Sequence, residues 1–132
     1  MTNQNPPRRS LRQLAVQAVV IIAASTGIVA VSATPSLAGC SHSSRNGPTF
    51  QFESVTGAGS GGVALRSGPH TSCNLYLRIP NGHQMEMYCY TRGDTINGWN
   101  SWSYVRYNSG SGDNFGWVAD AYLTNSGAYD AC

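Results

Sequence analysis

Residues 114–123, NFGWVADAYL, place a tryptophan between a glycine and a valine, with a tyrosine and a leucine close behind. Short apolar runs bounded by glycine and asparagine are typical of strands in a small β domain. Trp117 can therefore close a β core, or its ring can form the floor of an aromatic binding groove. The neighbouring segments decide between these two roles.

The rest of the chain repeats this pattern of short strands and glycine-bearing turns. Residues 49–55, TFQFESV, alternate phenylalanine with polar residues, which predicts a half-buried strand with Phe50 and Phe52 on its apolar side. The same reasoning predicts a loop at 91–100 and strands at 63–66, 75–79, 84–90, 101–107 and 115–118, with a turn and a last short strand at 119–123. Because no segment has a useful helical period, the sequence predicts an all-β fold, a small barrel of five to seven short strands.

Four cysteines, an even number in a short chain, predict two disulfides with three possible pairings. Asn81-Gly82 lies between two predicted strands and favours a two-residue hairpin turn. In that register Cys73 and Cys89 come within one residue of facing each other, so a Cys73–Cys89 bridge is favoured. Cys40 would then pair with Cys132 and join the two ends of the domain. The wide spacing argues against a zinc site.

The N-terminal segment has the layout of a secretory signal peptide. Residues 1–12 are polar and carry three arginines, residues 14–31 are mostly apolar, and small residues follow up to Ala38. We therefore expect cleavage after Ala38 and secretion, with the export route left open by the arginine pair at 8–9. One alternative is a membrane anchor, since about 18 apolar residues can just span a bilayer. Another is lipid attachment at Cys40, because LAGC (37–40) resembles a lipobox, although this would leave an odd number of cysteines.

Charge and residue types restrict the function of the remaining chain. Residues 39–132 carry five arginines, no lysine and six acidic residues, so no basic surface for nucleic acid is expected. A Cys–His hydrolase would need a free thiolate near His70, but Cys73 should be oxidised. The carboxylates are spread over separate segments, and only Asp94, Asp113 and Asp120 are candidates to meet at one end of a barrel. We expect a monomeric, non-enzymatic domain without cofactor or metal.

Several segments resemble bacterial SH3-like (SH3b) domains. VALRSGPHTSC (63–73) is similar to the family's opening motif, Asn-Val-Arg-x-Gly-Pro, with alanine at 64 in place of asparagine. IPNGHQMEMYC (79–89), WSYVRY (102–107) and GWVADAYL (116–123) resemble its middle and closing strands. The four cysteines are similar to those of small secreted SH3-like proteins of filamentous Gram-positive bacteria. The resemblance covers about residues 50–124 and implies a polar lead-in at 39–48, an SH3-like domain at 49–124 and a C-terminal tail at 125–132.

The resemblance also implies recognition of a cell-wall component, such as a peptidoglycan peptide or glycan, and the aromatic residues suggest where. Trp99, in a predicted loop, has no strand to bury it, and rings at strand ends can form the walls of a groove. An acidic side chain or Arg66 would pair with an amine or carboxylate of the ligand. The predicted ligand-binding residues are Tyr76, Tyr90, Asp94, Trp99, Trp102, Tyr107 and Asp120. The alternatives are a secreted effector or inhibitor that engages an extracellular protein and, more weakly, a cell-wall hydrolase.

Overall fold

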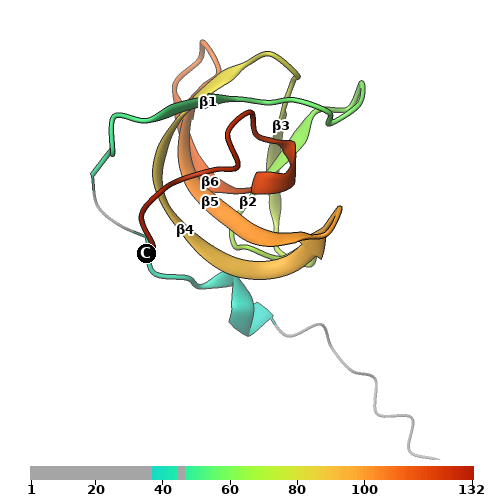
Figure 1. Ribbon diagram of the computed structural model, residues 1–132, viewed down its shortest axis with the longest axis vertical. Coiled ribbons are helices and arrows are strands. Elements are labelled where there is room, and N and C mark those ends of the chain that lie inside the picture. The colour runs from blue at the N-terminus through green and yellow to red at the C-terminus, as the bar shows by residue number, and fades with distance from the viewer. Residues whose placement is uncertain (1–36, 45–46) are drawn as a thin grey trace, which may run out of the picture. The chain divides into compact units, whose positions relative to one another are not determined.

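A computed structural model describes residues 37–44 and 47–132 (Figure 1). The predicted leader up to residue 36, including its arginine pair and apolar stretch, lies outside these residues. Within the described part of the chain, no helix combines the length and apolar character required to cross a membrane.

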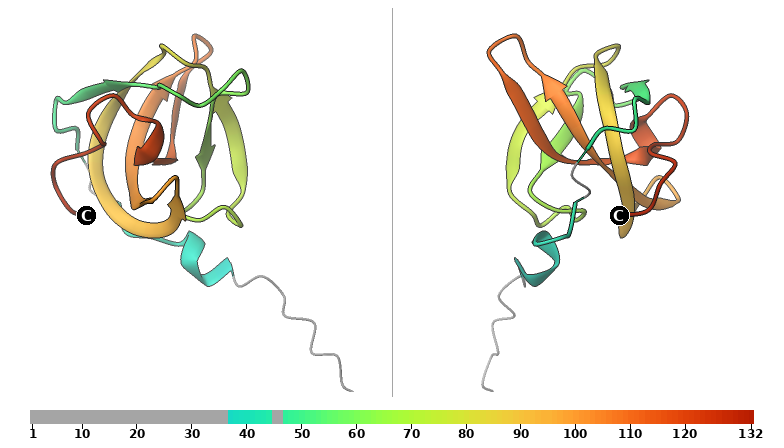
Figure 2. Two further views of the ribbon diagram at one scale, coloured as in Figure 1. Left: turned by 45° about the vertical axis from the view of Figure 1, so that its right-hand side comes forward. Right: turned by 90° about the vertical axis from the view of Figure 1, so that its left-hand side faces the viewer.

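The described residues form a half-barrel of six antiparallel strands, which confirms the predicted all-β fold. The strands follow one another across the sheet in the order β1-β4-β5-β6-β2-β3. Two of them, β4 and β5, are much longer than the others and bend strongly (Figures 1 and 2). The elements are η1 (Leu37–Cys40), β1 (Phe52–Ser54), β2 (Val63–Arg66), β3 (Leu75–Ile79), β4 (Gln84–Ile96), β5 (Trp99–Asn108), β6 (Asp113–Ala119) and η2 (Asp120–Tyr122), where η marks a 3-10 helix.

The predicted loop at 91–100 is wrong, because β4 and β5 continue into it and meet in a hairpin. Asn97 and Gly98 both have positive φ, 49° and 85°, which is what a two-residue hairpin turn that matches strand twist requires. The Asn97-Gly98 pair therefore makes the hairpin turn. The predicted final strand is also wrong, since η2 takes its place and only Leu123 forms a bridge, to Val55.

The predicted hairpin around Asn81-Gly82 is wrong as well. β3 has the predicted bounds, but it pairs with β2, placing Ile79 opposite Val63. β4 pairs instead with β1 and β5. The Asn81 side chain accepts a hydrogen bond from Ala58 N and donates one to Gly59 O. The turn is thus fastened to the 56–62 loop, and the two strands that leave it enter opposite ends of the sheet.

The disulfides differ from the favoured pairing for the same reason. They join Cys40 to Cys73 and Cys89 to Cys132, so all four cysteines are paired. Once β3 and β4 separate, Cys73 and Cys89 no longer face each other. A sulfur in the Cys40–Cys73 bridge cannot also carry a thioether-linked lipid, so this oxidised form is incompatible with lipid attachment at Cys40.

The core lies on the inner side of the curved sheet, where β2, β3, β4, β5 and β6 contribute Val63, Leu65, Ile79, Met85, Met87, Val105 and Val118. Trp117 belongs to a second buried cluster with Trp102 and Ala119. Its ring is only 1% exposed, and the His42 ring packs edge-on against it at 5.8 Å between centroids. Trp117 therefore closes the core and is not the floor of an open groove.

The first predicted strand is turned the opposite way. Phe50 and Phe52 are exposed, by 81% and 48%, whereas Glu53 is buried. The Glu53 carboxylate accepts hydrogen bonds from Gln51 Nε2 and from the Asn125 backbone N–H. A buried charge is tolerated when it is hydrogen-bonded in this way. Asn125 belongs to the C-terminal tail, so the alternation of residues within the strand could not reveal this contact.

The tail after η2 returns to β4 (Figure 1). Ala131 forms a parallel bridge with Tyr90, and the backbone of Tyr90 exchanges hydrogen bonds with Asp130 O and Cys132 N–H. Ala128 N–H donates to Ser103 Oγ. With the Cys89–Cys132 disulfide, these contacts make the tail an integral part of the fold.

Candidate functional site

The tail covers one end of β4 and β5 and encloses a hollow of about 210 Å³, which we call the tail pocket. Three of the predicted ligand-binding residues line it together: Tyr90 from β4, Trp99 from the start of β5 and Asp120 from η2. They are 9 to 30 positions apart in sequence, and the β4–β5 hairpin and the returning tail bring them together. The remaining lining residues are Arg92, Ser101, Ser126 and Ala128.

Asp120 lies at the bottom of the tail pocket and is only 2% exposed. Its Oδ1 accepts a hydrogen bond of 2.6 Å from Ser103 Oγ. Burial and, to a lesser extent, the negative charge of Glu53 raise the pKa of Asp120 to about 6, although hydrogen bonds from Ser103 and Ser101 oppose the shift. Gly127 packs directly against this carboxyl group, where a Cβ would clash with it.

Arg92 and Trp99 also line the tail pocket. The Arg92 guanidinium carbon lies 5.6 Å from the centroid of the Tyr90 ring, and its Nη1 donates to Asn100 Oδ1 at 2.8 Å. The Trp99 side chain is 48% exposed. A cation, a half-exposed indole and a buried carboxyl group can together hold a ligand that has both polar ends and an apolar middle.

The structure does not bring the other four predicted residues into this pocket. Tyr76 is exposed on β3. Trp102 is 2% exposed, and its indole N–H donates to Asp94 O at 2.9 Å. Tyr107 is 6% exposed in the core, with its hydroxyl 2.7 Å from His83 Nδ1. Both rings are therefore largely buried and neither lines the tail pocket, although Trp102 lines a different hollow.

Asp94 fastens the loop before β3 instead of facing the tail pocket. One carboxylate oxygen lies 2.8 Å from His70 Nδ1, and the other accepts hydrogen bonds of 2.7 Å from both the backbone N–H and the hydroxyl of Thr71. These hydrogen bonds, that of His70 first, lower the pKa of Asp94 to about 2. The carboxylate is ionised at neutral pH and all of its strong contacts are structural.

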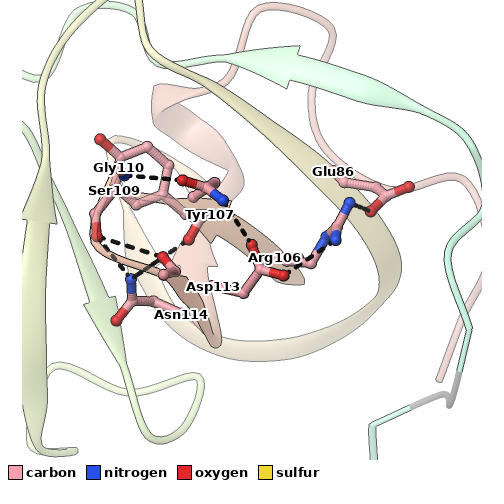
Figure 3. Close-up of polar contacts among 9 residues, drawn as sticks. Glu86, Arg106, Tyr107, Ser109, Gly110, Asp113 and Asn114 are labelled. Atoms are coloured by element: carbon pink, nitrogen blue, oxygen red, sulfur yellow. Dashed lines mark hydrogen bonds and ion pairs between the residues drawn. The ribbon is translucent and has the colours of Figure 1, made fainter.

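The acids predicted as candidates to meet at one end of the barrel have separate partners. Asp113 bonds to Arg106 and Asn108 at the β5–β6 hairpin, and Arg106 also pairs with buried Glu86 at 2.7 Å (Figure 3). Figure 2 shows this hairpin extending away from the other strands. Asp120 instead lies close enough to Glu53 for the two charges to interact. The arrangement gives Asp94, Asp113 and Asp120 no common site.

Sequence reasoning missed most of the polar residues of the tail pocket. Arg92 had a usable signal, since it follows Tyr90 by two positions, and residues two apart share one face of a strand. Ser126 and Ala128 had none, because their position depends on the tail returning to β4 through Cys132. Within residues 37–44 and 47–132, no three His, Cys, Asp or Glu side chains are grouped to hold a metal ion.

Comparison with known proteins gives two relatives and no match to a family model. The chain is 35% identical over 78 residues to the uncharacterized protein YraI of Bacillus subtilis (strain 168) and 33% identical over 78 residues to the uncharacterized protein YraJ of the same organism. Each match covers 55% of this chain and 66% of the relative, just under two thirds of its length.

Proposed function

We propose that this protein is a secreted, non-catalytic binding module that holds an extracellular peptide, such as a peptide of the bacterial cell wall, in the tail pocket. The single observation that carries the proposal is the convergence of Tyr90, Trp99 and Asp120 with Arg92 at one hollow. The resemblance to SH3b domains supports the choice of a cell-wall ligand.

Binding would use the chemistry of each wall of the tail pocket. The Trp99 ring would stack on an apolar or planar part of the ligand, and Arg92 would pair with a carboxylate. Asp120 would accept a hydrogen bond from a ligand amine or amide. A ligand amine at this position would also favour the charged form of Asp120 and lower its pKa.

We propose that no bond is made or broken. All four sulfurs are held in disulfides, so Cys73 cannot act as the nucleophile of a hydrolase. The weaker alternative, a hydrolase that uses carboxylates, would have to use the buried Glu53–Asp120 neighbourhood. Incubation of the purified protein with cell-wall fragments tests it, and release of soluble fragments that Asp120→Asn abolishes would overturn the non-catalytic assignment.

Sedimentation of the purified protein with isolated cell walls tests the proposed function. We expect retention on walls that have been stripped of protein by protease, and a decrease of about tenfold or more in affinity for Trp99→Ala, as is usual when a central aromatic contact is lost. Phe50→Ala is the matched control, because Phe50 is exposed but lines none of the pockets described here. Absence of the wild-type protein from the wall pellet would refute the proposal.

One observation favours a second candidate, an effector or inhibitor that engages an extracellular protein. Phe50 and Phe52, two positions apart in the chain, both expose large apolar side chains, and exposed apolar surface often marks protein contacts. In that case retention would disappear when the walls are treated with protease. Phe50→Ala would then weaken binding more than Trp99→Ala.

The two disulfides are typical of a chain that folds in an oxidising environment outside the cytoplasm. We propose that the leader is removed after Ala38 and that the protein is released. The mass of the intact mature protein, before and after reduction, tests both points. We expect a chain that starts at Gly39 and gains the mass of four hydrogens on reduction, whereas the mass of an attached lipid would indicate anchoring at Cys40.

A further inference from the structure

A second hollow of about 210 Å³ lies beside the β2–β3 ribbon, and we call it the arginine pocket. It shares no lining residue with the tail pocket. Its walls combine two arginines with apolar and aromatic surface: Arg66, Arg78, Thr71, Ile96, Trp102 and Tyr122, together with small residues of β2 and the preceding loop. Ala64 and Arg78 are directly paired across the ribbon, so Arg78 and Arg66, two residues from Ala64, lie on the same face.

The two guanidinium groups have unused capacity for hydrogen bonding. Arg66 Nη1 donates to Cys73 O at 2.9 Å, and Arg78 Nη1 donates to Gly62 O at 3.1 Å. Among the residues that the structure describes, neither group contacts a carboxylate, whereas Arg106 pairs with two. A guanidinium carries five N–H donors, so most donors of Arg66 and Arg78 remain available.

Asp94, which contacts a lining residue of the arginine pocket, already has hydrogen-bond partners for both carboxylate oxygens. Thr71, at the rim, holds the Asp94 carboxylate with its backbone N–H and its hydroxyl, and His70 takes the other oxygen. Trp102 uses its only polar atom on Asp94 O. The ring of Trp102 therefore presents only apolar surface to the arginine pocket. The arginine pocket is therefore a small hollow with apolar walls and two guanidinium groups that have available N–H donors.

We propose that the arginine pocket binds a free carboxylate next to a small apolar group, as found at the C-terminal residue of a peptide. The planar guanidinium group of an arginine can donate two parallel hydrogen bonds to the two oxygens of a carboxylate. The volume of about 210 Å³ is below the range of roughly 300–1,000 Å³ typical of pockets for whole drug-sized ligands. A hollow of this size accommodates one terminal residue of a ligand. The inference goes beyond the proposed function, because it concerns a separate site with its own ligand group.

Titration followed by ¹H–¹⁵N NMR tests this inference on the oxidised protein. The probe is acetyl-alanyl-alanine with a free carboxylate, and its C-terminal amide is the comparison ligand. We expect the acid to shift the side-chain N–H signals of Arg66 and Arg78 and the indole signal of Trp102. The amide, which lacks the charge, should bind at least about tenfold more weakly. Equal binding of acid and amide would overturn the inference, and so would the absence of shifts at millimolar acid.

Two substitutions distinguish this site from the tail pocket. Arg78→Gln removes one guanidinium group from an exposed position and should weaken binding of the dipeptide acid at least about tenfold. Arg92→Gln removes the arginine of the tail pocket and should leave the acid-induced shifts of the Arg66, Arg78 and Trp102 signals unchanged, because the two pockets share no lining residue. The opposite pattern would place the carboxylate in the tail pocket and refute the assignment. Inorganic phosphate is the third probe, and tighter binding of phosphate than of the dipeptide acid would show that the pocket recognises a phosphate-bearing ligand instead.

Discussion

Replacement of Asp120 by asparagine should change how the stability of the protein depends on pH. Asp120 is buried, and its pKa rises from 3.8 to about 6 on folding. Between these two values the folded protein binds a proton that the unfolded chain has lost. The contribution of this group to the free energy of unfolding is therefore greatest below pH 3.8 and decreases as the pH rises through 6.

The magnitude follows from the size of the shift. A rise from 3.8 to about 6 corresponds to about 3 kcal/mol, at 1.36 kcal/mol for each pKa unit. Asparagine has no proton to lose, so Asp120→Asn should not pay this cost at neutral pH. Because the unfolded carboxyl group is already partly ionised at pH 4, we expect the stability of the variant relative to the wild type to increase by about 2.4 kcal/mol between pH 4 and pH 7.5.

Urea unfolding at a series of pH values, followed by tryptophan fluorescence with the disulfides intact, measures this difference. The ¹³C signal of the Asp120 carboxyl group reports its titration directly, with an expected midpoint near pH 6. Ser103→Ala serves as a second variant, because loss of the hydrogen bond from Ser103 should raise the midpoint further. Parallel stability profiles for wild type and Asp120→Asn, or a midpoint near 4, would refute the reasoning.

Further predictions concern the parts of the fold that hold the two pockets in place. Replacing both Cys89 and Cys132 by alanine opens a link across 43 positions and should lower the free energy of unfolding by about 4 kcal/mol; a denaturant midpoint equal to that of the wild type would contradict this. Gly93→Ala would drive a Cβ into the Pro69 carbonyl, so soluble yield and thermal midpoint should both fall. Asp94→Asn should speed amide exchange in the 70–73 loop at pH 7. Because its pKa is lowered, the Asp94 carboxylate contributes its full stabilisation above pH 3.8, and this stabilisation is lost as the pH falls through about 2. Unchanged exchange would show that the loop does not depend on this carboxylate.

Local patterns in the sequence were sufficient to locate two strands. β2 and β3 have the predicted bounds, because short apolar runs ended by Ser67-Gly68-Pro69 and by Pro80 leave little freedom. Pairing was harder to predict. Of the Asn-Gly pairs at 81–82 and 97–98, only the second has positive φ at both positions. Turn propensity could not distinguish the two, since the choice depends on which strands find partners elsewhere in the sheet.

The candidate site was predicted in part for the same reason. Trp99 was correctly identified as an exposed ring, and Tyr90 and Asp120 do meet it in one pocket. Trp102 and Tyr107 lie outside the tail pocket and are largely buried, which the sequence could not show because an aromatic residue at a strand end has the same local sequence whether its ring faces solvent or the core. Phe52 is exposed and Glu53 is buried, the reverse of the predicted arrangement. The burial of Glu53 depends on a hydrogen bond from Asn125, 72 positions away, which the alternation within a strand does not report.

The observed disulfides follow one another along the chain and do not enclose each other. Cys40–Cys73 lies entirely before Cys89–Cys132. In a chain that emerges N-terminus first, the earlier bond can form before Cys89 and Cys132 are delivered, because both of its sulfurs are already available. Only the later bond has to await Cys132, so oxidative maturation of this protein can proceed in two successive steps without reshuffling.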